Sequence, residues 1–129
     1  MLSFLAVGGG AALGALLRWA LGLALDPVFP TLPLGTLTAN VAGGFLMGVA
    51  VQFFATHASA PPEVRLALTT GFLGGFTTFS TFSAEVVELL MRRLYGWGFV
   101  VIGAHVVGSL LFTVIGLVMA RLILWGGHS

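Results

Sequence analysis

Gly71-Phe72-Leu73-Gly74-Gly75-Phe76-Thr77-Thr78-Phe79-Ser80-Thr81-Phe82-Ser83 is the stretch that decides the fold, because it places a polar, glycine-containing segment inside an apolar run. Adjacent glycines weaken a helix, and five hydroxyl residues within seven positions can hydrogen-bond the backbone groups that a broken helix exposes. Non-helical backbone is tolerated at membrane depth only when it is buried in protein or lines a wet cavity. We therefore predict a transmembrane helix broken within residues 74–83, and we expect the functional site at this break, where freed carbonyl groups can hold a cation.

The rest of the chain has the composition of a membrane protein. Of its 129 residues, 58% are hydrophobic and 7% are charged, whereas about 25% of residues are charged in soluble domains. Mean hydropathy is +1.10. Because about 20 helical residues cross a bilayer core, the apolar runs predict one all-α integral membrane domain over residues 1–129 with four transmembrane helices. The approximate spans are residues 2–25, 34–55, 64–94 (the broken one) and 97–125.

Charge and composition argue against several classes of function. The formal net charge is +1, and basic residues are too few to form a surface for nucleic acid. The chain has no cysteine, which argues against disulfides, thiolate chemistry and iron–sulfur or structural zinc sites. No set of nucleophile, base and acid is visible in the sequence, so we do not expect an enzyme.

Four of the five arginines are evenly divided between the two sides of the predicted bundle, with Arg65 and Arg121 on one side and Arg92 and Arg93 on the other, while Arg18 lies within a span and is ambiguous. Since basic residues normally favour the cytoplasmic side, this balance gives insertion almost no direction. Either another factor orients the protein, or the chain inserts both ways and pairs antiparallel with a second copy.

Small residues spaced four apart recur in all four runs. They let helix backbones approach closely in lipid, which indicates a compact bundle, and an oligomeric one because a 129-residue chain is short to surround a pathway. The pairs are Gly10/Gly14, Gly44/Gly48, Gly71/Gly75 and Ala104/Gly108.

Polar side chains at membrane depth are costly unless they are paired or hydrated, so each is a candidate functional residue. Asn40 either hydrogen-bonds a neighbouring helix or replaces water around an anion. Arg18 either extends to an interface or provides positive potential for anion entry. Glu85 is either a solvated residue near a helix end or part of a water-filled vestibule. His105 is more readily a packed, hydrogen-bonded side chain than a ligand.

Four phenylalanines of the broken segment follow a helical spacing of four, three and three residues, which would place them on one stripe. Such a stripe is usually packing. Alternatively, the ring edges, which carry positive electrostatic potential, line a path that favours a small anion. The four residues are Phe72, Phe76, Phe79 and Phe82.

Motifs in three of the four runs resemble the Fluc (CrcB-type) fluoride channels of bacteria. They are Gly9-Gly10 with Gly14-Ala15 and Arg18-Trp19, then Gly35-Thr36-Leu37-Thr38-Ala39-Asn40 with Gly43-Gly44-Phe45-Leu46-Met47-Gly48, and the stretch over residues 71–83 quoted above. The resemblance implies a dual-topology homodimer of antiparallel subunits in the bacterial inner membrane. Two pores would pass fluoride passively out of the cytoplasm, relieving fluoride toxicity, and a structural sodium ion (Na+) would lie at the dimer centre.

The resemblance also implies roles for individual residues. The family's pore side chains match Asn40, Phe79, Phe82, Ser80, Thr81, Ser109, Glu85 and Arg18. Its sodium site uses backbone carbonyl groups, which match those of Gly74 and Thr77 in each subunit. Donors of this kind suit fluoride, because a small, strongly hydrated ion needs its water replaced along a narrow path.

Two other functions stay open from the residues alone. A proton-coupled exporter of small organic cations would carry its proton on Glu85 or His105, although such a transporter is expected to keep an acidic residue deep in the bundle and no acid precedes Asp26. An accessory subunit of a larger membrane complex would need only the glycine faces.

Overall fold

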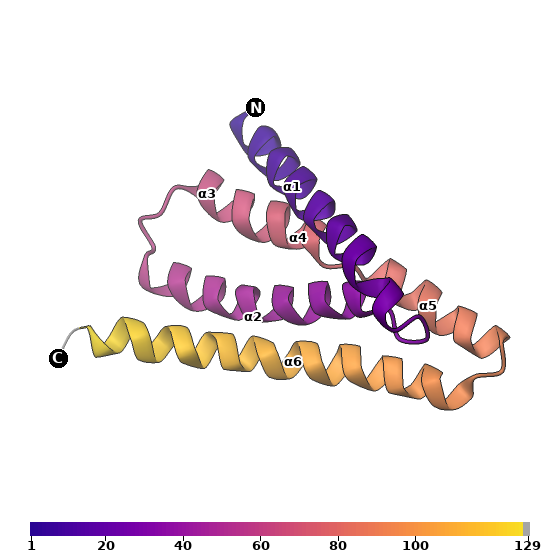
Figure 1. The fold of residues 1–129 in the computed structure, drawn as a ribbon. Coiled ribbons are helices and arrows are strands. Elements are labelled where there is room, and N and C mark those ends of the chain that lie inside the picture. Colours follow the sequence, from indigo (N-terminus) through magenta and orange to yellow (C-terminus); the bar gives the residue numbers. More distant parts are fainter. Residues whose placement is uncertain (128–129) are drawn as a thin grey trace.

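The computed structural model describes residues 1–127, which form helices joined by short connections, with no strand among them (Figure 1). The predicted all-helical architecture is thereby confirmed. The helices are α1 (Leu2–Leu25), the 3₁₀ turn η1 (Asp26–Val28), α2 (Leu34–Thr56), α3 (Pro62–Leu66), the π-helix η2 (Ala67–Leu73), α4 (Gly74–Phe76), α5 (Phe79–Met91) and α6 (Tyr95–Gly126).

Within residues 1–127, three helical segments are long and apolar enough to cross a membrane, namely Leu2–Val28, Leu34–Thr56 and Tyr95–Gly126. The fourth segment of the bundle is divided. It runs from α3 through η2 and α4, and it resumes as α5 after two residues of extended backbone, Thr77 (φ −87°, ψ 155°) and Thr78 (φ −151°, ψ 120°). Successive segments reverse direction, so α2 and α6 run opposite to α1 and to the divided segment (Figure 1).

The break in the divided segment is narrower than predicted. Gly74 and Gly75 are helical, as are the residues from Phe79 onward, so only the two threonines leave the helix rather than the whole of residues 74–83. The glycine at 75 serves close packing instead, because a Cβ there would collide with the backbone of Ala11 in α1. The helix is interrupted by threonines whose hydroxyl groups bond the local backbone.

α1 packs against η2 and α4 through glycines on both sides of the contact. A Cβ on Gly10 would overlap the carbonyl oxygen of Ala67, and one on Gly14 would overlap that of Phe72. The predicted pairs Gly10/Gly14 and Gly71/Gly75 therefore lie on opposite sides of one helix–helix contact. Backbone lies against backbone here, which is how helices associate when lipid offers no hydrophobic driving force.

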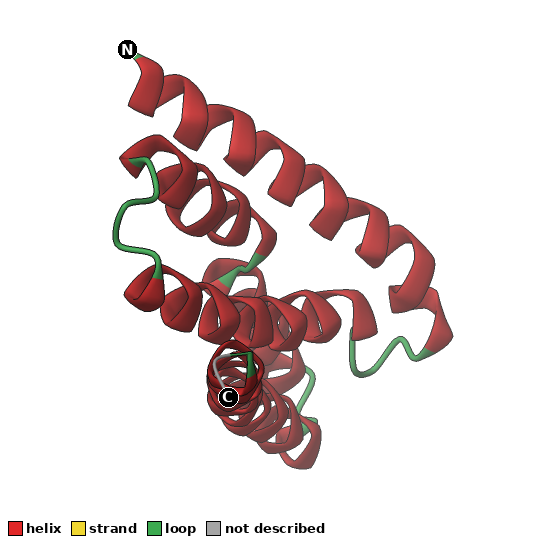
Figure 2. Cartoon of the chain, turned by 90° about the vertical axis from the view of Figure 1, so that its left-hand side faces the viewer, coloured by secondary structure: helices red, strands yellow, loops and turns green. Residues whose placement is uncertain are grey.

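α2 lies alongside α6, its most extensive partner, in both views of the chain (Figures 1 and 2). Gly44 and Gly48 bring the backbone of α2 against Ser109 and Thr113 of α6. The divided segment contacts α1, α2 and α6, so its break lies where the three long helices can reach it. Two small apolar clusters fix it there: Phe82, Val86, Leu89 and Val101 between α5 and α6, and Ala50, Phe54 and Leu73 between α2 and η2.

Candidate functional site

Asn40 of α2 clamps the peptide backbone at the break. Its Oδ1 accepts the N–H of Thr78 at 2.7 Å, and its Nδ2 donates to the carbonyl oxygen of Thr78 at 2.9 Å. One side chain thus satisfies both backbone groups that Thr78 would otherwise leave unpaired at membrane depth. Of the two roles that the sequence left open for Asn40, the bond to a neighbouring helical segment is present.

The two threonines of the break close the helix ends on either side of it. Thr77 donates to the carbonyl oxygen of Leu73 through its N–H (3.0 Å) and its hydroxyl group (2.9 Å), which ends α4. Thr78 is the N-cap of α5, and its Oγ1 accepts the N–H of Thr81 at 3.2 Å. A threonine at an N-cap is the usual solution for a helix start, so α5 can begin inside the bundle.

Arg18 of α1 lies against the break from the other side. Its Nε donates to the carbonyl oxygen of Gly75 at 3.1 Å. In a continuous helix that oxygen would receive the N–H of Phe79, which now stands at the start of α5. The guanidinium group therefore replaces a lost helical donor, a placement that neither of the two sequence interpretations of Arg18 included.

His105 of α6 completes the network around Asn40. Its Nδ1 lies 3.0 Å from Asn40 Nδ2, and its ring stacks on that of Phe82 with centroids 4.6 Å apart. The side chain is 4% exposed. Its Nε2 is buried without a hydrogen-bond partner among residues 1–127.

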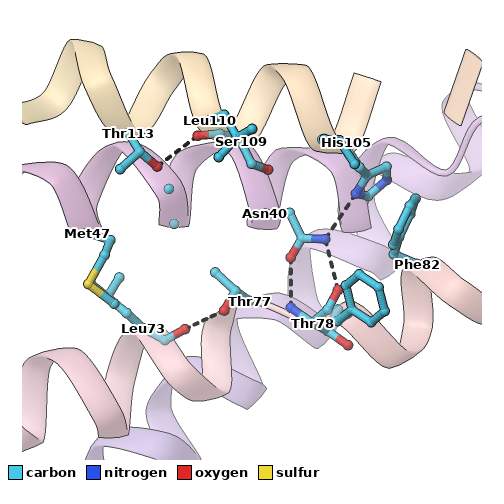
Figure 3. A pocket seen from close by; sticks show the side chains of 14 residues that line it. Asn40, Met47, Leu73, Thr77, Thr78, Phe82, His105, Ser109, Leu110 and Thr113 are labelled. Carbon is cyan, nitrogen blue, oxygen red and sulfur yellow. Dashed lines mark hydrogen bonds between the residues drawn. The ribbon is translucent and has the colours of Figure 1, made fainter. Parts of the chain in front are cut away.

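A cavity of about 430 Å³ opens beside this network, between α2, the divided segment and α6 (Figure 3). Asn40, Phe82 and His105 lie at one end of it in the figure, and Met47 and Leu73 lie at the other. The hydroxyl groups of Thr77 and Thr113 are bonded to the carbonyls of their own helices, at 2.9 and 2.8 Å. The lining residues are Asn40, Gly43, Gly44, Met47, Leu73, Thr77, Thr78, Phe79, Phe82, His105, Val106, Ser109, Leu110 and Thr113.

The structure brings half of the predicted site residues to this cavity. Asn40, Thr77, Phe79, Phe82 and Ser109 line it, whereas the other five do not. Those five are Arg18, Gly74, Ser80, Thr81 and Glu85. Ser80 and Thr81 stay close to the break, since their hydroxyl oxygens lie 3.2 and 3.1 Å from Thr78 Oγ1. Gly74 is exposed on the surface of the subunit, in the last turn before the break.

Glu85 forms a second polar contact between α2 and α5, one helical turn beyond the cavity. Its Oε1 accepts the hydroxyl hydrogen of Thr36 at 2.6 Å, and its Oε2 is buried without a partner in the described chain. Thr36 precedes Asn40 by four residues and Glu85 follows Phe82 by three, so on each helix this contact lies about one turn from a residue that lines the cavity. Glu85 is thus held by a neighbouring helix.

Phe79 and Phe82 meet edge to face, with ring centroids 5.4 Å apart and ring planes at 69°. Their environments differ, because Phe82 is 7% exposed and Phe79 is 77% exposed in the single subunit. Thr77 and Thr78 next to Phe79 are only half-buried in the subunit, and because irregular backbone does not face lipid, this face of the subunit needs a partner or a pathway.

Sequence reasoning missed several contacts of the site. It gave Thr78 only the role shared by the five hydroxyl residues of the break and did not identify it as the N-cap of α5, although threonine is a preferred N-cap residue. It also did not connect His105 with Asn40, which is 65 residues away along the chain. No local pattern reports a pairing of that kind.

Comparison with known proteins agrees with the sequence resemblance. The family described as CrcB-like protein, Camphor Resistance (CrcB), matches residues 5–117. A protein of Nitrosospira multiformis is 57% identical over 116 residues, covering 90% of this chain and 91% of its own length. One of Ralstonia pickettii is 59% identical over 115 residues, covering 89% and 91%, and one of Thiobacillus denitrificans is 56% identical over 116 residues, covering 90% and 94%. All three relatives are named fluoride-specific ion channel FluC.

Proposed function

The chain belongs to the CrcB-like family, and from that premise we propose that it is a membrane channel that conducts fluoride passively. Relatives that share more than half of the aligned residues carry that activity in their names, which also supports a channel rather than an enzyme. In a bacterial inner membrane such a channel lets fluoride leave the cytoplasm. This function relieves fluoride toxicity without consuming energy.

The observation that best supports the proposal is the break itself, held open by Asn40 beside a cavity. Fluoride crossing lipid needs groups that replace its water, and these must bind it weakly enough to release it. Phe79 and Phe82 of α5 and Ser109 of α6 line the cavity, so aromatic rings and a hydroxyl group are available there. Ser80, Thr81 and Glu85 extend polar groups along α5 beyond it.

An antiparallel homodimer would cover what the single subunit leaves open. Thr77 and Thr78, the two residues of extended backbone, are only half-buried in the single subunit, and irregular backbone does not face lipid. A second copy, inserted in the opposite direction, would cover this face and add the second wall of each of two pores. The even division of arginines favours such dual insertion.

A structural sodium ion fits the backbone of the break. The N–H of Thr78 bonds Asn40, so the Gly74 carbonyl lacks the donor that a continuous helix would supply. The N–H of Thr81 donates to Thr78 Oγ1, so the Thr77 carbonyl also lacks the donor that a continuous helix would supply. Carbonyls of Gly74 and Thr77 from both subunits would hold the ion, whose charge would offset their converging dipoles.

Reconstitution of the purified protein into liposomes tests the proposed function. We expect electrogenic fluoride efflux, read by a fluoride electrode with valinomycin present, and no matching chloride efflux. Fluoride movement strictly coupled to protons would show that the protein is a proton-coupled exporter and not a channel. No fluoride movement from liposomes that contain well-folded protein would contradict the proposal and favour an accessory subunit.

The antiparallel arrangement has its own test. A tag on the amino terminus should be found on both sides of the membrane in comparable amounts. A tag found on one side only would exclude dual insertion, while leaving fluoride conduction to the liposome assay.

A further inference from the structure

A second pocket lies between the end of α2 and the start of the divided segment, away from the break. Its volume is about 330 Å³, and no residue that lines it also lines the cavity beside Asn40. We call it the Arg65 pocket. Its lining residues are Ala50, Val51, Phe54, Ala55, Arg65 and Thr69.

The Arg65 pocket lies at the level where the bundle meets the membrane surface. α2 has 23 residues, which corresponds to a length of about 35 Å, slightly more than a hydrocarbon core of about 30 Å. The pocket occupies the last two turns of α2 and the beginning of α3 and η2, next to the connection between α2 and α3 (Figure 1). The headgroup of a lipid and the upper part of its acyl chain lie at this depth.

The wall that α2 contributes to the pocket is apolar. Ala50 and Phe54 form its buried part, at 3% and 6% exposed, whereas Val51 is 51% exposed, so the pocket opens on the surface of the subunit. Small side chains at Ala50 and Ala55 leave space that larger ones would fill. A wall of this composition suits a hydrocarbon chain better than a polar ligand.

The guanidinium group of Arg65 is an unpaired cation at this pocket. Its Cζ lies 5.2 Å from the centroid of the Phe54 ring, and within residues 1–127 the group forms no hydrogen bond or ion pair. Glu63 lies on the opposite side of α3, because residues two apart on a helix do not share a face. The hydroxyl group of Thr69 already donates to the Arg65 carbonyl at 2.8 Å. The pocket therefore offers an anion the N–H groups of Arg65, and its lining contains no acidic residue.

We propose that the Arg65 pocket binds one anionic phospholipid, with the phosphate on the guanidinium group and the upper part of an acyl chain against Phe54 and Ala55. Charge complementarity favours this occupant, since an unpaired cation stands beside an apolar wall at headgroup depth, and phosphate accepts well from a planar guanidinium group. A zwitterionic lipid carries its own ammonium group near the phosphate and gains less from Arg65. The inference goes beyond the proposed fluoride conduction and does not depend on it.

Native mass spectrometry of the full-length protein tests the proposal, with phosphatidylglycerol or phosphatidylcholine added at equal concentrations. We expect the wild type to bind phosphatidylglycerol about tenfold more tightly. Arg65→Gln should weaken phosphatidylglycerol binding about tenfold, which is about 1.4 kcal/mol, and should leave phosphatidylcholine binding unchanged. Arg65→Lys keeps the positive charge and should stay within about threefold of the wild type. Equal binding of the two lipids by the wild type would overturn the proposal, as would a Lys variant as weak as the Gln variant.

Arg121→Gln is the matched control. Arg121 also lies over an aromatic ring, with its Cζ 4.7 Å from the centroid of the Trp125 ring, but it does not line the pocket. This variant should bind phosphatidylglycerol like the wild type. A loss as large as that of Arg65→Gln would mean that the lipid responds to the total charge of the protein, which contradicts a site at Arg65.

Two further measurements separate the lipid from other occupants that carry an anionic group. Inorganic phosphate should leave the midpoint of thermal unfolding in detergent unchanged, whereas phosphatidylglycerol should raise it; an equal rise with phosphate would make the pocket a site for a free anion and overturn the proposal. Ala55→Leu fills the exposed end of the wall and should weaken phosphatidylglycerol binding about as much as Arg65→Gln does. Unchanged binding in Ala55→Leu would show that no acyl chain enters the pocket and would contradict the proposal.

A second copy of this chain is the remaining occupant to exclude. If a second copy covered the pocket, the wild type would bind no phosphatidylglycerol there, and Arg65→Gln would shift the protein toward monomer in size-exclusion chromatography. Either result would overturn the proposal. Because none of these readouts uses flux, they stay separate from the test of conduction: a failed lipid site leaves fluoride conduction to the liposome assay, and absent flux leaves the lipid site to these measurements.

Discussion

The divided segment is packed in two different ways on its two sides. Against α1 it presents Gly71 and Gly75, which meet Gly10 and Gly14 so closely that a methyl group on any of them would strike backbone or a facing glycine. Against α2 and α6 it leaves a cavity of about 430 Å³ beside Asn40 and His105. The contact with α1 fixes the position of the break in the bundle. The cavity on the other side leaves room for an ion beside the break.

In this chain the tight backbone contact with α1 supports the broken helix, and that support allows the opposite side of the break to face a cavity. Extended backbone at Thr77 and Thr78 persists because α1 holds the helix before it and Asn40 holds the peptide within it. The difference also predicts that substitutions on the α1 side act on folding, whereas substitutions on the cavity side act on conduction.

The largest effect is expected for Gly14→Leu. A side chain at Gly14 would enter the backbone of η2 and α4 at Phe72 and Phe76, and overpacking of this kind costs about 3 kcal/mol or more when backbone must move. We expect loss of monodisperse protein in detergent, measured by size-exclusion chromatography. Gly9→Leu is the matched control, because a Cβ at Gly9 meets nothing within 4 Å in the subunit. Normal assembly of Gly14→Leu would show that the contact with α1 is loose, so that the two sides of the divided segment would not differ in how tightly they are packed.

The next effect is expected for Asn40→Asp. A carboxylate keeps the shape and the bond to the Thr78 N–H but cannot donate to the Thr78 carbonyl or to His105. A carboxylate about 4 Å from a passing anion repels it by about 4 kcal/mol at an effective dielectric constant of about 20, so the fluoride flux should fall by about a hundredfold or more. Fluoride efflux from liposomes, read by a fluoride-selective electrode, measures this loss. Thr38→Val on the same helix, outside the cavity lining, should conduct normally. Wild-type flux in Asn40→Asp would remove Asn40 from the mechanism.

Much of this arrangement could be predicted from residue types, and some of it could not. Apolar length predicted the helices, and hydroxyl groups beside glycines predicted a break in the third run, because both features are local. The extent of the break was predicted wrongly, since a glycine that permits close packing and a glycine that ends a helix look alike in sequence. Gly75 permits close packing and does not end the helix.

The contacts that define the site join residues far apart in the chain. Arg18 reaches Gly75 across 57 positions, and Asn40 reaches His105 across 65. Helical periodicity shows which residues share a face, but it does not show which faces meet. For that reason Asn40 and His105 were each named from the sequence, while their pairing was not predicted.

Arg18→Gln tests whether the α1 side also contributes through a hydrogen bond. The guanidinium donates to the Gly75 carbonyl, and a bond from a charged donor contributes about 1.5–3 kcal/mol. We expect a lower midpoint of thermal unfolding in detergent. Arg92→Gln, at the exposed C-cap of α5, is the control and should change the midpoint little. An unchanged midpoint with reduced flux at low ionic strength would instead make Arg18 an attractor of anions, and would place part of the conduction on the α1 side.

Phe79→Ile tests the cavity side more finely. Isoleucine keeps the apolar bulk and loses the ring edge, and electrostatic contacts of aromatic rings contribute about 0.5–1.5 kcal/mol. The flux should fall by up to about tenfold, while the unfolding midpoint stays close to that of the wild type because isoleucine keeps most of the apolar bulk and Phe79 contributes little to packing within the subunit, where it is 77% exposed. Phe99→Ile, at an exposed position on α6, controls for loss of a phenylalanine in general. Equal flux in the two variants would mean that Phe79 only packs against a partner.

The smallest effect is expected at the other end of α5, which is closed without help from any cavity residue. Arg93 has φ 58°, and Leu94 and Arg93 donate to the carbonyls of Leu89 and Leu90 at 2.9 and 3.0 Å, a Schellman arrangement. A left-handed conformation costs about 1 kcal/mol for a residue with a Cβ and almost nothing for glycine. Arg93→Gly should therefore unfold at a higher temperature than Arg93→Ala, since both lack the charge and differ only in the methyl group. Both should conduct fluoride like the wild type, because this end of α5 lies away from the cavity lining. Equal stability of the two variants would mean that the left-handed turn does not form, and a change in flux would mean that the C-terminal end of α5 helps to position its cap at Thr78.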